Sequence, residues 1–125
     1  MRKAVTTDRA PLPMGPYSQA IVDGDLVYLA GMGPVSPETG KPELGDIRAQ
    51  TTLTFRNVKA VLEAAGSSLD EVIRCTVYLQ DIGDFAAMNE VYARTFDPPY
   101  PARTTIQAAA LPAGIAVEIE CTARR

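Results

Sequence analysis

Alternation of apolar and polar residues in the second half of the chain constrains the fold most strongly. The segment from Val72 to Gln80 alternates strictly, and residues 102–110 and 115–123 repeat the pattern. A period of two is typical of strands that bury one face and leave the other polar. The pattern therefore predicts a sheet with one covered face. In the first of these segments the predicted inward residues are Ile73, Cys75, Val77 and Leu79.

Two segments with helical spacing are predicted to cover that apolar face. Asp46 is a good N-cap for the first, whose apolar stripe runs from Ile47 to Ala65 and stops before Gly66. Asp84 is the expected cap of the second helix. Its predicted inner stripe consists of Phe85, Met88, Tyr92 and Phe96.

The first half of the chain predicts short strands and one long loop. Residues 3–8 and 18–22 have extended patterns, and Asp23-Gly24 is a hairpin signal that returns the chain through residues 25–30. Residues 31–45 carry four glycines and three prolines, so we expect an irregular loop of a length that is often functional. The last two strands are predicted to form a hairpin through Leu111–Gly114.

This order of elements predicts a single α+β domain over residues 1–125. Strands in adjacent pairs favour a mixed, mostly antiparallel sheet, and two helices suffice for only one of its faces. The other face carries mainly polar side chains and is either solvated or a subunit interface; periodicity leaves both alternatives open.

The amino-acid composition limits the kinds of catalytic, metal and binding sites that the chain can form. The chain has no histidine, two cysteines and a net charge of −3. Catalysis through histidine and histidine-ligated zinc are excluded, and two cysteines cannot build an all-thiolate zinc site, so we predict no metal site. We also expect no nucleic-acid or membrane partner, because neither a basic footprint nor a long apolar run is present. With no apolar leader, the chain is expected to be cytoplasmic, with Cys75 and Cys121 as reduced core thiols.

The polar face of the predicted hairpin holds the candidates for chemistry. Arg103, Thr105 and Gln107 alternate with smaller residues, and we expect them to share a face with Glu118 and Glu120. A turn centred on Pro112-Ala113 places Arg103 about 13 Å along the strand from Glu118. The two residues then serve different ends of one pocket or meet across a subunit boundary. Arginine is suited to clamp a carboxylate, and a partly buried glutamate to act as a base.

Several motifs together resemble the Rid family, the reactive intermediate deaminases. The resemblance covers residues 3–125. It rests on Gly15–Ala20, Ala30-Gly31, Asn57–Leu62, Asp84-Phe85 with Asn89, Pro101–Arg103 and Val117–Glu120.

The resemblance implies a fold, an assembly and an activity. The fold would be a chorismate-mutase-like α+β sandwich, assembled as a homotrimer with a central barrel and clefts between subunits. The activity would be hydrolysis of enamine and imine acids such as 2-aminoacrylate to 2-keto acids and ammonia, without a cofactor.

The resemblance also implies roles for individual residues. Arg103 would hold the substrate carboxylate, Glu118 would activate water, and the backbone at Gly31 would help fix the substrate. Tyr17 and Asn89 would line the cleft and orient substrate or water, which makes Tyr17 a third catalytic candidate beside Arg103 and Glu118. Ala30 and Thr105 would also contact the substrate. Both depart from the family pattern, because many deaminating members have serine at the position of Ala30 and cysteine at that of Thr105.

Two alternatives to the deaminase hypothesis stay open. The first is a trimer that binds small carboxylates or keto acids without turnover, which the loss of a serine hydroxyl at Ala30 favours. The second is a ribonuclease, against which the net charge of −3 and the absence of histidine argue.

Overall fold

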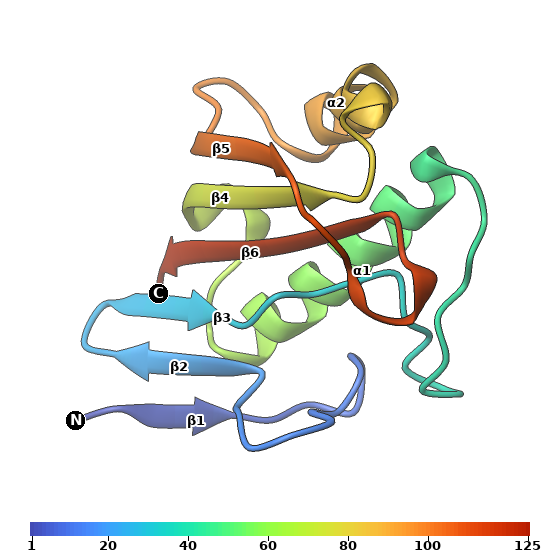
Figure 1. The fold of residues 1–125 in the computed structure, drawn as a ribbon. Coiled ribbons are helices and arrows are strands. Elements are labelled where there is room, and N and C mark those ends of the chain that lie inside the picture. Colours follow the sequence, from blue (N-terminus) through green and yellow to red (C-terminus); the bar gives the residue numbers. More distant parts are fainter.

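The computed structural model describes residues 1–125 as one six-stranded sheet with two helices. The strands lie in the order β1-β2-β3-β6-β4-β5, from bottom to top in Figure 1. Every neighbouring pair is antiparallel except β4 and β5. The elements are β1 (Lys3–Val5), β2 (Ala20–Asp23), β3 (Leu26–Leu29), α1 (Ile47–Ala64), β4 (Val72–Leu79), α2 (Phe85–Thr95), β5 (Ala102–Gln107) and β6 (Val117–Arg124).

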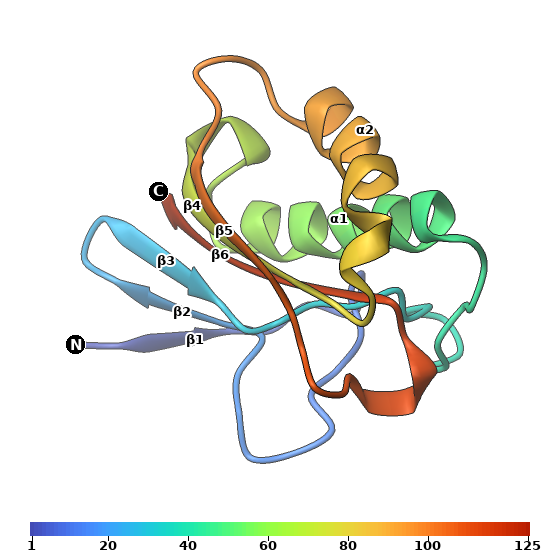
Figure 2. The same cartoon turned by 45° about the horizontal axis from the view of Figure 1, so that its top comes forward.

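Both helices pack on the same face of the sheet, which confirms the predicted α+β class (Figure 2). We call this the helix face and the other the open face. The core lies between the helices and the sheet, and its fully buried residues include Val61 and Leu62 of α1 and Val77, Leu79 and Ile119 of the strands. Neither helix combines the length and the apolar character that a membrane span requires.

The ends of α1 lie where the sequence predicts them. The Asp46 carboxylate accepts a hydrogen bond from the backbone N–H of Ala49 at 2.8 Å. At the other end Gly66 has φ of 79°, and the N–H groups of Gly66 and Ser67 bond to the carbonyls of Glu63 and Leu62. This is a Schellman stop, which needs glycine because other residues are strained at that φ.

The predicted hairpin between the last two strands is wrong. β5 lies at the edge of the sheet, parallel to β4, and β6 lies between β3 and β4. The connection after β5 therefore crosses the end of β4, where the Leu79 carbonyl accepts from Ala108 N–H and the Ala116 carbonyl from Gln80 N–H. The physical reason is burial: β6 offers four fully apolar inward positions and takes a central place, whereas β5 is only half covered.

The new strand order also corrects the predicted faces. Directly opposed residues of neighbouring strands point to the same face, and Arg103 and Thr105 lie opposite the inward residues Cys75 and Val77. Arg103, Thr105 and Gln107 therefore point to the helix face. Glu118 lies opposite Tyr78 and points to the open face, as Glu120 and Thr122 do. The expectation that the two groups share one face is wrong.

Smaller differences have local causes. A register shift between Val72 and Arg74 turns Val72 inward and leaves Ile73 41% exposed, so Ile73 is not the core residue predicted. The Asp84 side chain makes no capping hydrogen bond. The first hairpin is confirmed, with Gly24 at φ of 61° as its first central residue, which suits a type II′ turn.

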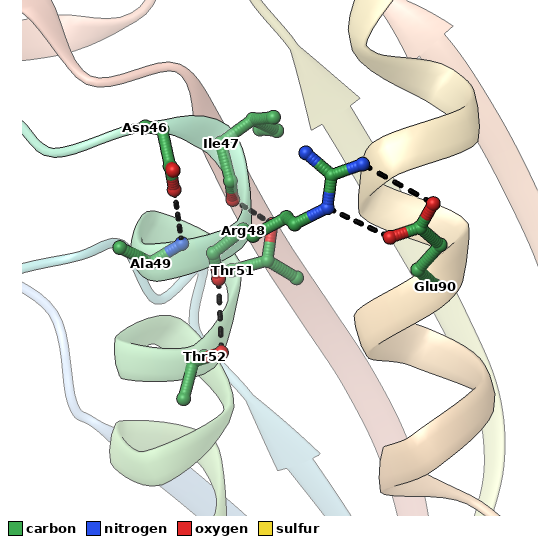
Figure 3. A network of polar contacts seen from close by, with 7 residues as sticks. All are labelled: Asp46, Ile47, Arg48, Ala49, Thr51, Thr52 and Glu90. Atoms are coloured by element: carbon green, nitrogen blue, oxygen red, sulfur yellow. Dashed lines mark hydrogen bonds and ion pairs between the residues drawn. The ribbon is translucent and has the colours of Figure 1, made fainter.

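Two polar contacts of α1 hold neighbouring parts of the fold. Asn57 is fully buried, and its Nδ2 donates to the carbonyls of Gly33 and Val35 at 3.0 and 2.8 Å, which ties the long loop to the helix. Arg48 reaches α2 and donates twice to Glu90, at 2.7 and 3.1 Å (Figure 3). The first contact is buried and the second exposed.

This difference predicts unequal effects on stability. Asn57→Ala leaves the Val35 carbonyl without a partner and removes one of the two donors to the Gly33 carbonyl, so it should cost about 1–3 kcal/mol of unfolding free energy. Arg48→Ala removes a solvent-exposed ion pair and should cost less than about 1 kcal/mol. Urea unfolding of both variants measures the two values, and an equal or larger loss in Arg48→Ala would contradict the assignment.

Candidate active site

Arg103 lies on the helix face at the edge of the sheet, against aromatic rings of α2. Its Cζ atom is 4.5 Å from the ring centroid of Tyr92 and 5.4 Å from that of Phe85. The side chain is half-buried and takes part in none of the three ion pairs of the chain. The guanidinium thus lies against two aromatic rings, while its N–H groups have no carboxylate partner.

A concavity of about 370 Å³ opens beside this arginine. It is lined by Asn89, Tyr92, Ala93, Tyr100, Pro101 and Arg103. The structure therefore brings together the predicted site residues Arg103 and Asn89. Thr105 lies two residues along β5 on the same face as Arg103.

Polar atoms without partners gather in this region. Asn89 Oδ1 and Thr105 Oγ1 are buried and form no hydrogen bond, and the buried Tyr92 Oη has no partner other than the weakly bonding Cys75 thiol. Buried polar groups are normally paired, so such a group of orphans is a feature of sites that a polar ligand completes. Burial, followed by the neighbouring Cys75 thiol, raises the pKa of Tyr92, and this hydroxyl therefore stays protonated.

Glu118 and Gly31 form a second cluster on the open face. A Cβ atom added at Gly31 would lie 2.8 Å from Glu118 Oε2, so the carboxylate occupies space that any side chain at position 31 would take. Paired hydrogen bonds between Met32 and Ile119 fix the two segments side by side. The predicted residues Gly31 and Glu118 are therefore in direct contact.

The electrostatics of this cluster favour a base. Burial, with a smaller effect of nearby Glu120, raises the pKa of Glu118 above the ordinary value of 4.5. Glu120 itself accepts a hydrogen bond from the Tyr78 hydroxyl at 2.8 Å, which occupies one of its oxygens. Glu118 forms no such bond and is the carboxylate available to water or substrate.

Ala30 directly precedes Gly31, and the segment that carries Tyr17 reaches the same end of β3. The Gln19 carbonyl accepts from Ala30 N–H at 2.9 Å, so the segment that carries Tyr17 runs beside the end of β3. Tyr17 is exposed, and its hydroxyl accepts from Met14 N–H within its own loop. Ala30 offers only backbone groups to a ligand.

One chain does not bring Arg103 and Glu118 together. Two strand spacings, or about 10 Å, separate β6 from β5, and the two side chains leave opposite faces of the sheet. The chain thus carries two half-sites: Arg103 with Asn89 and Thr105, and Glu118 with Gly31. No three histidine, cysteine, aspartate or glutamate side chains form a metal-ligand group.

Three aromatic residues of the arginine half-site are not among the site residues that the sequence predicts. Phe85 and Tyr92 are predicted for the inner stripe of the second helix, where Tyr92 is indeed part of the core, and no role is predicted for Tyr100. A signal was present: Asn89 interrupts the stripe between Phe85 and Tyr92 at helical spacing, and a polar residue within an apolar stripe favours a site.

A six-stranded sheet with two helices on one face is the fold of the Rid-type domain. The chain belongs to the Rid family: the family model described as Endoribonuclease L-PSP matches residues 7–125.

Named relatives agree with this family. A RutC family protein of Pyrococcus horikoshii is 49% identical over 98% of both chains. Reactive Intermediate Deaminase A of Arabidopsis thaliana, a chloroplastic protein, is 43% identical over 98% of this chain and 65% of its own length. The crystal structure of RidA from an Antarctic Psychrobacter superposes with a TM-score of 0.94 at 44% identity, covering 98% of this chain and 99% of the other.

The raised pKa of Glu118 predicts a pH-dependent stability difference. A carboxyl whose pKa is raised on folding stabilises the fold at low pH, and this contribution is lost as pH rises through the raised value. Glu118→Gln should therefore raise Tm above that of the unsubstituted protein near pH 8 and leave Tm unchanged near pH 4. Calorimetric scans across this range test it; a constant difference at all pH values would contradict it.

Proposed function

We propose that the protein hydrolyses reactive 2-imino acids, and the enamines that tautomerise to them, to 2-keto acids and ammonia. The observation that carries the proposal is Arg103, a half-buried guanidinium without a carboxylate partner beside orphaned polar atoms. A ligand carboxylate would satisfy it with paired hydrogen bonds. The deaminase name of the Arabidopsis relative supports the same reaction class.

We further propose that three copies assemble so that each site joins two of them. Arg103, Asn89 and Thr105 of one subunit would face Glu118 and Gly31 of its neighbour. Support comes from the two half-sites on opposite faces and from exposed apolar side chains on the open face, among them Tyr28 and Ile106. A neighbouring subunit would cover these and complete each cleft.

The chemistry requires only orientation and a modest base. Arg103 holds the carboxylate, so that the adjacent iminium carbon meets a water molecule on Glu118. The water oxygen bonds to that carbon as Glu118 takes its proton. The C=N π electrons move to the nitrogen, which then receives the proton from Glu118. Glu118 next takes the hydroxyl proton as the C=O bond forms and the C–N bond breaks, and ammonia leaves. An iminium carbon is already electrophilic, so no histidine is needed.

A second candidate is a keto-acid-binding trimer without turnover. Ala30 favours it, because a methyl group at this position supplies no hydrogen bond to a reacting water or substrate. Ribonuclease activity, which the family description mentions, is not proposed: the net charge of −3 and the absence of histidine give no support for RNA binding or acid–base cleavage.

Arg103→Ala tests the proposed reaction. Imines made in situ from apolar amino acids by an amino-acid oxidase should lose ammonia faster with the unsubstituted protein, and the substitution should reduce kcat/KM by at least about 100-fold, since a charge-assisted bidentate contact is lost. The coupled release of keto acid and ammonia gives the rate.

The matched control is Arg56→Ala, an exposed arginine on α1, which should retain full activity. Equal rates for the unsubstituted protein and Arg103→Ala would refute the reaction. Tight 2-oxobutanoate binding by the unsubstituted protein, with no turnover of any imine, would instead support the binding trimer.

A further inference from the structure

Phe85 is a large apolar side chain that the core does not use. It is the first residue of α2, it is 40% exposed, and it stands outside the buried core cluster, contrary to its predicted place on the inner stripe. Its ring contacts Arg103, whose Cζ atom lies 5.4 Å from the ring centroid. The side chain therefore needs an explanation other than packing.

Tyr92 contacts the same guanidinium from a rigid position. It is 5% exposed, and its ring packs against those of Phe55 and Phe96, with centroids 5.7 and 4.9 Å away. Phe85 lies seven residues earlier, two turns along the same side of α2. Tyr92 thus forms a fixed support for Arg103, and Phe85 is a second, exposed ring beside it.

We propose that Phe85 is a positioning residue, which holds Arg103 in the orientation that binds the substrate carboxylate. The negative face of an aromatic ring attracts a guanidinium without using its N–H groups. Two rings of one helix therefore restrict the arginine side chain and leave its hydrogen-bonding edge free for a ligand. Since an unrestrained arginine loses much rotamer freedom on binding, pre-orientation favours affinity. This inference rests on the proposed function of Arg103.

Three variants separate positioning from packing. Phe85→Leu keeps an apolar side chain but removes the ring, and Phe85→Tyr keeps the ring. Ile82→Ala is the matched control, because Ile82 is 48% exposed in the turn before α2 and has no recorded contact with Arg103. For each variant we would measure the Kd for 2-oxobutanoate by calorimetry and the KM and kcat for an imine made in situ. The Tm and the mass of the assembly show whether the variant is folded and assembled.

Phe85→Leu should raise Kd and KM together by about 3- to 10-fold, the size of a partly exposed cation–π contact, with kcat within about twofold. Phe85→Tyr should restore both constants, and Ile82→Ala should change neither. Unchanged Kd in Phe85→Leu, a loss in kcat alone, or dissociation of the assembly would overturn the inference. If Arg103→Ala also binds 2-oxobutanoate normally, the proposed function itself fails; if only Arg103→Ala loses binding, the role of Phe85 alone fails.

Discussion

The place of β6 between β3 and β4 is the constraint on which the arrangement of the candidate site depends. Because β6 takes the central position, β5 is left at the edge as a parallel partner of β4, joined to it by α2. This crossover turns Arg103 toward the helix, while Glu118 on β6 points to the open face. This topology thus separates Arg103, the proposed carboxylate-binding group, from Glu118, the proposed base.

Different interactions position Arg103 and Glu118 for their proposed roles. Arg103 lies against two aromatic rings of α2, and its guanidinium N–H groups have no carboxylate partner. Glu118 is held by a close approach to Gly31, and partial burial raises its pKa so that it accepts a proton more readily than an exposed carboxylate. In the proposed reaction, an imino acid would offer its carboxylate to Arg103 and its electrophilic carbon to a water molecule on Glu118.

The sequence predicts those features of the fold that depend on neighbouring residues in the chain. It does not predict those that depend on which strands pair with each other. The cap at Asp46, the stop at Gly66 and the inward face of β6 follow from local chemistry and were predicted correctly. Periodicity assigns alternate residues of a strand to two faces but does not say which strand lies beside it, so the hairpin and the face of Arg103 were predicted wrongly. A helix between two strands favours a parallel crossover, and that rule applied to residues 72–107 would have placed Arg103 correctly.

Subunit mixing tests the central claim most directly. Arg103→Ala and Glu118→Gln should each be inactive alone, since each breaks one half of every site. In trimers reassembled from an equal mixture, about a quarter of the clefts receive an intact Arg103 from one subunit and an intact Glu118 from its neighbour. We therefore predict recovery of about a quarter of the unsubstituted activity. Mixed trimers, verified by mass, that recover no activity would contradict a site shared between subunits.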